Sequence, residues 1–299
     1  SSAVVLKSGL VLVAGGFYSS DAVLYNPYTD TWTPTGDMSV ARYLASAVRL
    51  ASGKVLISGG IEYWYMNEGS EVYDPSTGTW SYSGSMELPR WGHQSTLLRS
   101  GKVLVTGGEV YIRTGPDVRI EPATRTELFD PATGEWSSAG DLGHFALDGV
   151  TSVLNSGEVV LTSSSGTDIY NPSTNTWRHV SGPDFGDHSA TRLYSGQVLA
   201  AQSTGAVSLY DPYTKSWSAG PGMNQGHYKH TSILLYSGQV LVTGGRGGTE
   251  LYDPSTRTWS QYEGAPGAYS NATALLLHTG QVMLVGGEEH TDTVAIFTP

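Results

Sequence analysis

The segment Tyr73-Asp74-Pro75-Ser76-Thr77-Gly78-Thr79-Trp80 contains a motif, Asp/Asn-Pro-x-Thr-x-x-Trp, that occurs six times along the chain and indicates a repeat fold. The Trp follows the Pro by five residues in every copy. The six copies run from Asn26 to Trp32, Asp74 to Trp80, Asp130 to Trp136, Asn171 to Trp177, Asp211 to Trp217 and Asp253 to Trp259. A phrase that returns about every 40 to 50 residues is typical of propellers and other repeat arrays.

The chemistry of this phrase predicts a strand, a tight turn and a second strand. An Asp or Asn side-chain oxygen caps the turn, and Pro presets φ at the next position. An apolar strand such as Glu71-Val72-Tyr73 precedes the turn, and the Trp opens the next strand. We expect the Trp to pack between neighbouring repeat units, where it buries a large area in a defined orientation.

A second phrase returns seven times: an apolar strand, a turn containing Gly, another apolar strand and often Gly-Gly. The turn glycines are Gly9, Gly53, Gly101, Gly157, Gly196, Gly238 and Gly280. The pairs are Gly15-Gly16, Gly59-Gly60, Gly107-Gly108, Gly244-Gly245 and Gly286-Gly287. Ser163-Ser164 and Gln202-Ser203 stand at the aligned positions of repeats four and five. Because Gly adopts positive φ at low cost, we expect these two repeats to turn differently.

Together the phrases describe a four-stranded antiparallel meander, which cannot bury both faces alone and packs against further copies of itself. The sequence therefore predicts an all-β, seven-bladed β-propeller that fills residues 1–299 as one domain. Its repeats span approximately 1–40, 41–88, 89–145, 146–184, 185–224, 225–267 and 268–299.

The double glycine, the aromatic before the turn and the spaced Trp resemble the kelch repeat over essentially the whole chain. The closest resemblance is to secreted or surface kelch arrays of bacteria. It implies a propeller, and an extracellular or cell-surface location. The seventh unit departs from the pattern, since it ends at Phe297-Thr298-Pro299 and has no Trp strand. It is therefore three-stranded, or its missing strand lies outside this chain. A six-bladed ring with an extra hairpin is the alternative.

The composition excludes several function classes. The net charge of −11 argues against nucleic acid and anionic membranes, because both need clustered Lys and Arg. The absence of cysteine excludes disulfides, thiolate metal sites and Cys nucleophiles. No apolar run approaches the roughly 20 residues of a membrane span. Any signal peptide is expected to have been removed or never to have existed, and we expect a monomer.

The variable loops after the second and fourth strands are the expected functional face, because binding residues gather on loops held by a rigid scaffold. The loops after the second strand are long in repeats two and three, and they contribute Tyr63, Trp64, Tyr111 and Arg113. Arg246 occupies the matching loop of repeat six. The exposed Trp64 and Trp91 have no repeat role, which favours ligand binding for this set.

The loops after the fourth strand are expected to form a ring of Arg, His and aromatic side chains. Its candidate ligand-binding members are Arg42, Tyr43, Arg90, Trp91, His93, His188, Tyr228 and His230. The functional interpretation is a ligand funnel in which aromatic rings stack on sugars or peptides and Arg fixes carboxylates. The structural alternative, favoured for each His singly, is a hydrogen bond to backbone between repeats.

No motif indicates catalysis, and we expect no catalytic residue, no metal and no cofactor. Galactose oxidase and its relatives carry similar propellers, but their copper site uses a Tyr cross-linked to Cys, which this chain lacks. Glu62, Glu109, Asp148 and Glu288 could supply a carboxylate pair for glycosidic chemistry. The sequence thus predicts a non-enzymatic module that binds a protein or glycan. The alternatives are an enzyme acting on a sugar-like molecule and an architectural part of a larger surface protein.

Overall fold

The computed structural model describes all residues except 64, 115–116, 147–148, 246, 266–268 and 288–293. The described residues contain no helix, and their strands form nine sheets, of which six have four strands, two have three and one has two. Neighbouring strands in these sheets run antiparallel, as in β1–β2, β18–β19 and β31–β32. The prediction of an all-β chain built from four-stranded meanders is therefore confirmed. Two compact units are distinguished, residues 1–149 with 172–177 and residues 150–171 with 178–299, and each is described by itself.

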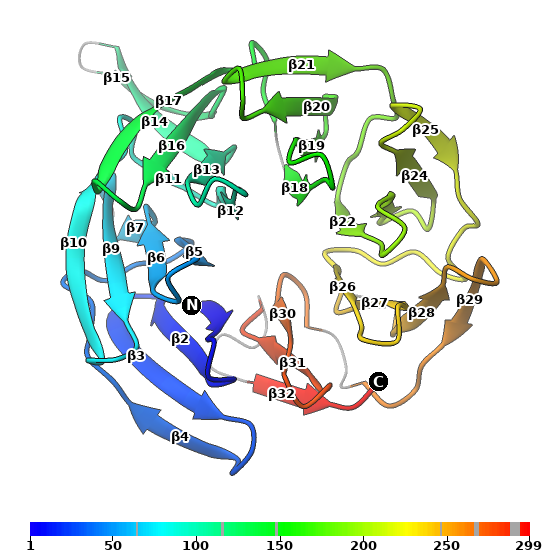
Figure 1. The fold of residues 1–299 in the computed structure, drawn as a ribbon, viewed down its shortest axis with the longest axis horizontal. Coiled ribbons are helices and arrows are strands. Elements are labelled where there is room, and N and C mark those ends of the chain that lie inside the picture. The colour runs from blue at the N-terminus through cyan, green and yellow to red at the C-terminus, as the bar shows by residue number, and fades with distance from the viewer. Residues whose placement is uncertain (64, 115–116, 147–148, 246, 266–268, 288–293) are drawn as a thin grey trace. The chain divides into compact units, whose positions relative to one another are not determined.

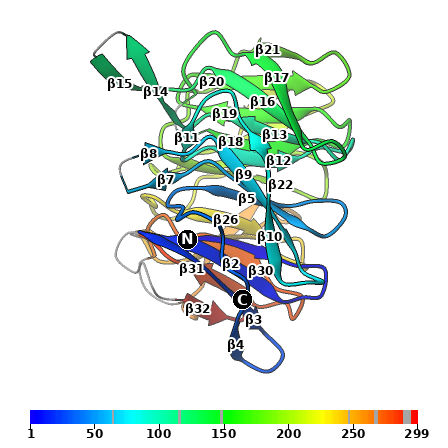
Figure 2. The same ribbon diagram turned by 90° about the vertical axis from the view of Figure 1, so that its left-hand side faces the viewer.

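The first unit contains three four-stranded sheets, in the orders β1–β2–β3–β4, β5–β6–β9–β10 and β12–β13–β16–β17. Two smaller sheets, β7–β8 and β11–β14–β15, are added to these. The strands are β1 (Ser2–Val5), β2 (Val11–Gly16), β3 (Ser19–Asn26), β4 (Thr31–Pro34), β5 (Ser46–Arg49), β6 (Val55–Ser58), β7 (Ile61–Glu62), β8 (Tyr65–Met66), β9 (Gly69–Asp74), β10 (Thr79–Ser85), β11 (Arg90–Trp91), β12 (Gln94–Leu97), β13 (Val103–Thr106), β14 (Glu109–Thr114), β15 (Asp117–Pro122), β16 (Arg125–Asp130) and β17 (Glu135–Asp141). Figure 2 shows the hairpins β7–β8 and β14–β15 projecting from the same side of this unit.

The second unit holds the sheets β22–β23–β24–β25, β26–β27–β28–β29 and the three-stranded β30–β31–β32, and most of the sheet β18–β19–β20–β21 (Figure 1). Strand β21 begins in the first unit, and its residues from Arg178 onward belong to the second. The strands are β18 (Val150–Val153), β19 (Val159–Ser163), β20 (Gly166–Asn171), β21 (Thr176–Val180), β22 (His188–Arg192), β23 (Val198–Gln202), β24 (Val207–Asp211), β25 (Ser216–Ala219), β26 (Thr231–Leu234), β27 (Val240–Thr243), β28 (Glu250–Asp253), β29 (Thr258–Gln261), β30 (Thr273–Leu276), β31 (Val282–Val285) and β32 (Val294–Phe297).

The Asp-Pro turns form as their chemistry predicts. The Oδ1 atom of Asp74 accepts a hydrogen bond from the Ser76 N–H at 2.9 Å, and Asp253 accepts one from the Ser255 N–H at 2.8 Å. Asp130 accepts the equivalent bond from the Ala132 N–H at 3.0 Å. Each of these turns joins the third strand of its sheet to the fourth, so that the Trp strand is an edge strand.

The repeat Trp residues are structural, as predicted. The ring of each of Trp32, Trp80, Trp136, Trp217 and Trp259 packs on the aromatic residue just before the end of the third strand, as in Tyr73–Trp80, whose ring centroids lie 5.1 Å apart. From repeat two to repeat six the indole N–H donates to the preceding repeat, for example from Trp80 to the Gly36 carbonyl at 2.8 Å and from Trp217 to Thr167 Oγ1 at 3.0 Å. A side chain that packs on its own sheet and donates a hydrogen bond to the preceding repeat fixes how neighbouring repeats stack.

The double glycines all adopt positive φ, and the two repeats that lack them turn differently, as expected. At Gly15, with φ of 71°, a Cβ would lie 2.5 Å from the Arg42 carbonyl oxygen. In repeat four, Ser163 pairs with Gly166 in a tight hairpin instead.

The last sheet, β30–β31–β32, has three strands and ends at Phe297. It matches the three-stranded form of the seventh repeat that the sequence predicts. Strand β31 is buried along its whole length. Within the described part of the chain, no helix is long and apolar enough to cross a membrane.

Candidate functional site

The two predicted ligand-binding arginines of the first unit are buried in ion pairs. Arg42 Nη2 lies 3.2 Å from Glu71 Oε1 of β9, and its Nη1 donates to the Gly59 and Gly69 carbonyls at 2.8 Å each. Burial lowers the pKa of Arg42, while Glu71 opposes that shift. Glu71 also accepts the Ser39 N–H at 2.8 Å. The guanidinium of Arg42 therefore bonds to protein groups and fixes the position of the loop that leads into β5.

The same arrangement returns one repeat later. Arg90 Nη2 lies 2.7 Å from Glu127 Oε1 of β16, and Glu127 accepts the Glu87 N–H at 2.6 Å. Arg90 Nη1 donates to the Arg125 carbonyl at 3.0 Å. Both side chains are almost wholly buried, so the pair contacts protein and not solvent. These positions favour a structural role for Arg42 and Arg90, and their predicted contact with a ligand remains a prediction.

Repeat six uses a His at this position. His227 Nε2 lies 2.8 Å from Glu250 Oε1 of β28, and both side chains are fully buried. Asn224 contributes its N–H at 2.9 Å and its side-chain amide at 2.6 Å to Glu250 Oε2. Burial alone raises the pKa of Glu250, but the hydrogen bonds from His227 and Asn224 outweigh it and hold the pKa below its usual value. This buried carboxylate, three residues before the Asp of Asp-Pro, was missed by sequence reasoning. Its regular spacing was the available signal.

The three ring histidines are also buried and bonded to protein. His93 Nε2 lies 3.0 Å from Ser58 Oγ, and His188 Nε2 lies 2.7 Å from Thr162 Oγ1. His230 donates to the Ala201 carbonyl, with a distance of 3.1 Å. Each partner belongs to the second strand of the preceding repeat. His230 bonds to backbone there, as the structural alternative expects, whereas His93 and His188 bond to side-chain hydroxyl groups. Burial, helped by Arg90 and Arg42, lowers the pKa of His93 to about 3.

Three exposed aromatic side chains and one half-buried Tyr of the first unit form a cluster, which we call the aromatic surface: Phe17, Tyr18, Tyr63 and the half-buried Tyr43. The ring centroids of Phe17 and Tyr43 lie 5.5 Å apart, and those of Tyr18 and Tyr63 lie 5.1 Å apart in a stacked arrangement. The ring centroids of Phe17 and Tyr18 lie 4.0 Å apart. The exposed fractions are 64% for Phe17, 45% for Tyr18 and 59% for Tyr63. An apolar cluster of this kind is unusual on a free surface.

The backbone that presents this surface is strained. Tyr18 has φ of 59°, Leu44 has 55° and Tyr63 has 53°, all in the left-handed region that bulky residues avoid. Backbone bonds hold these segments together, from the Gly16 N–H to the Arg42 carbonyl at 3.0 Å and between Tyr43 and Ile61 in both directions. Strain of this kind persists where surrounding structure enforces it and gathers at functional sites.

A second aromatic pair lies on the next repeat. Trp91 of β11 and Tyr111 of β14 have ring centroids 5.7 Å apart, and both are partly buried. The Gly92 N–H donates to the Leu44 carbonyl at 2.9 Å, which connects this pair to the segment beside Tyr43. Thus Tyr43 and Tyr63 share one cluster and Trp91 and Tyr111 another.

Of the remaining predicted ligand-binding residues, Tyr228 is described by the structure and lies in the other unit. Tyr228, in the second unit, is exposed, with Lys229 Nζ 5.4 Å from its ring centroid. Trp64 and Arg246 lie outside the described residues, as do Asp148 and Glu288, and the side chain of Arg113 is not described either.

A buried carboxylate with an exposed His partner stands in the second unit. Asp168 of β20 occupies the repeat position of Glu71, Glu127 and Glu250, and its Oδ1 lies 3.1 Å from His179 Nδ1 of β21. The Asp168 side chain is 2% exposed and the His179 side chain 55% exposed. Sequence reasoning missed this pair, because two residues eleven positions apart on neighbouring strands form no recognisable motif.

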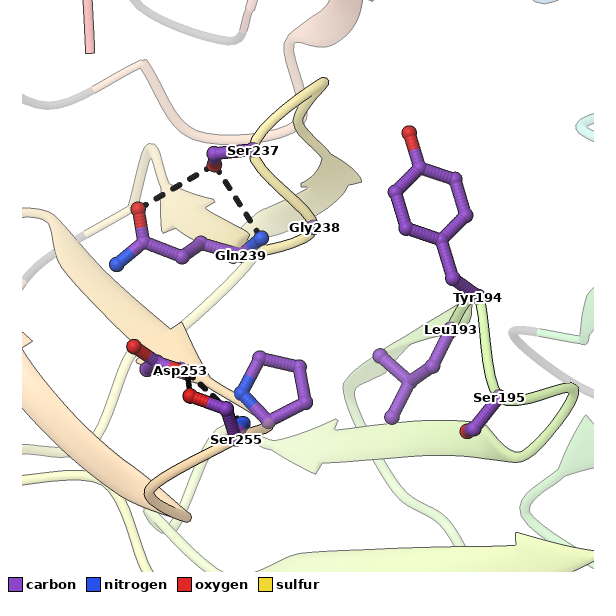
Figure 3. Close-up of a pocket in the computed structure, with 9 residues that line it drawn as sticks. Leu193, Tyr194, Ser195, Ser237, Gly238, Gln239, Asp253 and Ser255 are labelled. Carbon is purple, nitrogen blue, oxygen red and sulfur yellow. Dashed lines mark hydrogen bonds between the residues drawn. The ribbon is translucent and has the colours of Figure 1, made fainter.

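The second unit also carries an open pocket of about 450 Å³ beside the Gly-containing turns (Figure 3). Tyr194, Gly238 and Pro254 line it, together with Leu193, Ser195, Ser237, Gln239, Asp253 and Ser255. Its polar atoms are used within the turns, since Asp253 Oδ1 accepts from both the N–H and the hydroxyl of Ser255. The pocket lies among turn residues that the repeat itself requires, and nothing in it indicates a reaction.

A copper centre of the galactose-oxidase kind does not fit the residues present. That centre needs a Tyr cross-linked to Cys, and the chain has no cysteine. His93, His188, His227 and His230 are each bonded to protein at a buried position. No step of chemistry is therefore derived through such a centre.

Comparison with known proteins establishes the fold. No family model and no curated protein matches the sequence. Among solved structures, a fungal alcohol oxidase of the AA5 family, in complex with copper, matches with a TM-score of 0.77 and 15% identity over 95% of this chain and 69% of that one. The prediction of a non-enzymatic binding module is contradicted by this finding, because the protein with the matching fold is an oxidising enzyme. This chain has an all-β, β-propeller-like fold related to that of an AA5 alcohol oxidase.

Proposed function

We propose that this chain is an enzyme that acts on the alcohol groups of sugar-like molecules, with its substrate held against the aromatic surface of the first unit. The observation that carries the proposal is the exposure of Phe17, Tyr18 and Tyr63 on backbone strained at Tyr18 and Tyr63. The rigid ring faces offer the apolar contact that the C–H faces of a pyranose need, at low entropic cost.

The arrangement of the surface also suits a sugar. Its rings come from three separate segments, the turn after β2, the loop before β5 and the β7–β8 hairpin, and backbone hydrogen bonds hold these segments together. A site preformed in this way loses little free energy on binding. The matching fold of an alcohol oxidase supports the reaction class, while the missing Cys requires that this chain use a different centre from a Tyr–Cys copper site.

The test is a screen of the purified chain against sugars, sugar alcohols and simple alcohols. Hydrogen peroxide, new carbonyl groups and new reducing ends are measured, with and without added copper. We expect turnover of at least one sugar-like substrate. Replacing Tyr63 by Ala should raise KM by up to about tenfold with little change in kcat, since one aromatic contact contributes about 0.5–1.5 kcal/mol.

Tyr28→Ala is the matched control, because Tyr28 is a Tyr of the first unit that is 61% exposed, on the Asn26-Pro27 turn outside the aromatic surface. Its KM should equal that of the wild type. Absence of turnover for every substrate class, or an unchanged KM in Tyr63→Ala, would refute the proposal.

We also propose the finer features of the fold. The seven repeat units are seven blades of one kelch-type propeller, and the chain acts as a monomer outside the cell or at its surface. The hydrogen bonds from the repeat Trp residues to the preceding repeat support the stacking of the units.

A further inference from the structure

We propose that the open pocket of the second unit binds an alkylammonium group, the chemistry that a lysine side chain or a small primary amine presents. This inference does not depend on the proposed function, because it concerns other residues in the other unit. It starts from the carboxylate of the repeated Asp-Pro turn, which is present in repeats two, three, five and six as Asp74, Asp130, Asp211 and Asp253.

The chain itself shows what fits beside this carboxylate. In repeat two, Lys54 Nζ lies 2.9 Å from Asp74 Oδ2, and in repeat three, Lys102 Nζ lies 3.0 Å from Asp130 Oδ2. Each Lys directly follows the turn glycine of its own repeat. Because Oδ1 of the Asp accepts the hydrogen bond that caps the turn, Oδ2 is the oxygen that receives the ammonium group.

Repeat six keeps the carboxylate and loses the Lys. Gln239 stands at the position of Lys54 and Lys102, and its neutral amide supplies no charge. Asp253 Oδ1 accepts the hydroxyl and the N–H of Ser255, and these bonds lower the pKa of Asp253, so the carboxylate is ionised at neutral pH. Within the described part of the chain, no Lys, Arg or His forms an ion pair with Asp253.

The residues around Asp253 form the pocket of about 450 Å³, and Tyr194 of the preceding repeat lies on its other side (Figure 3). The Tyr194 ring lies against the turn of repeat six, since a Cβ added at Gly238 would lie 3.3 Å from Tyr194 Cδ2. Its hydroxyl donates to the Leu235 carbonyl at 3.4 Å, and the side chain remains 68% exposed. Aromatic faces attract cations and also pack against methylene chains. The pocket therefore offers an alkylammonium ligand a carboxylate and an aromatic ring.

Among the residues that the structure describes, repeat six alone combines these two groups. Repeat five has the carboxylate of Asp211, but Asn155 stands there at the position of Tyr194. Repeat seven has Tyr236 at that position, but Thr298 replaces the Asp. The net charge of −11 further favours the approach of a cation.

The experiment titrates the full, isotopically labelled chain with butylammonium chloride at low ionic strength and follows the backbone amide signals by nuclear magnetic resonance. The signals of Gly238 and Ser255 should shift with a dissociation constant in the millimolar range, because an exposed ion pair and a cation–π contact are each weak. Butanol has the same alkyl chain without the charge and should bind at least about fivefold more weakly.

A second titration, with Nα-acetyl-lysine methylamide, distinguishes the two sources of the ammonium group. Binding tighter than that of butylammonium assigns the pocket to a lysine side chain of a protein, because the peptide groups then add contacts. Equal binding assigns it to small amines as well. Either result supports the proposed ligand chemistry.

Gln239→Lys restores the residue of repeats two and three. Its ammonium group should occupy Asp253, as Lys54 occupies Asp74, and it should weaken butylammonium binding by at least about fivefold. Gln197→Lys is the matched control, because Gln197 has the same position in repeat five, outside the pocket, and the variant should bind like the wild type.

Asp253→Asn and Tyr194→Ala should each raise the dissociation constant of butylammonium by about two- to fivefold. Asn at this position keeps the turn, because Asn26 caps the same turn of repeat one by accepting the Tyr28 N–H at 3.0 Å. The proposal is overturned if butylammonium leaves the pocket signals of the wild type unshifted, if butanol binds as tightly, or if Gln239→Lys binds butylammonium as well as the wild type does.

Discussion

At the scale of single residues, the chain repeats one solution to one problem. A carboxylate at the same place in the third strand is buried by its neighbours, and it is compensated by Arg, by Arg and then by His. The two arginines were predicted to bind a ligand because Arg on a variable loop suggests recognition. The structure shows that each Arg side chain instead points inward and pairs with a Glu. The Glu that pairs with Arg42 lies 29 residues further along the sequence.

His93 makes stability depend on pH. In the unfolded chain a His titrates near about 6.5, whereas in the folded chain burial lowers the pKa of His93 to about 3. Between these two pH values the unfolded state binds more protons than the folded state. The contribution of His93 to the free energy of unfolding is therefore fully present above about pH 6.5 and is lost as the pH falls. At pH 5 this one residue is expected to cost about 2 kcal/mol relative to pH 7.

The variant His93→Gln should remove that dependence while keeping a group that can bond to Ser58. Urea unfolding at pH 7 and pH 5 should show a difference in free energy that is smaller by about 2 kcal/mol than in the wild type. His278→Gln, at an exposed position, should leave the difference unchanged. Equal pH dependence in wild type and His93→Gln would show that His93 is not the group responsible.

At the scale of elements, the double-glycine turns bring the second strand against the incoming loop. A Cβ added at Gly15 (φ 71°) would lie 2.5 Å from the Arg42 carbonyl oxygen. A Cβ added at Gly92 (φ 64°) would meet no atom within 4 Å. The two positions share the left-handed backbone and differ in crowding. They therefore separate the cost of conformation from the cost of close approach.

Gly92→Ala should cost about 1 kcal/mol of stability, from the positive φ alone. Gly15→Ala should cost at least about 2 kcal/mol more, because backbone atoms must shift to admit the methyl group. Urea denaturation of both variants measures this difference. Equal losses of unfolding free energy in the two variants would contradict this prediction, because they would mean that the backbone around residue 15 admits the methyl group without cost.

At the scale of the whole molecule, the number of blades and the closure of the ring stay predictions. If the seven units form one compact propeller, small-angle scattering should give a radius of gyration of about 19 Å for 299 residues. Hydrogen exchange separates this from a six-bladed ring with an extra hairpin. In a seven-bladed ring the amides of β31 should exchange as slowly as those of β27, since both strands are buried throughout. Much faster exchange in β31 would favour the six-bladed alternative.

The strand units, the capped Asp-Pro turns, the positive-φ glycine pairs and the structural role of the Trp residues could be predicted from the sequence, which left open whether the last repeat has three strands. All of these depend on chemistry that acts within a few residues, or on a phrase repeated often enough to be unmistakable. The burial of Arg42 and Arg90, the clustering of Phe17, Tyr18, Tyr43 and Tyr63 and the contact between Asp168 and His179 became visible in the folded chain alone. The physical reason is that these contacts join separate strands and loops, whose side chains meet only after the sheets have formed and stacked.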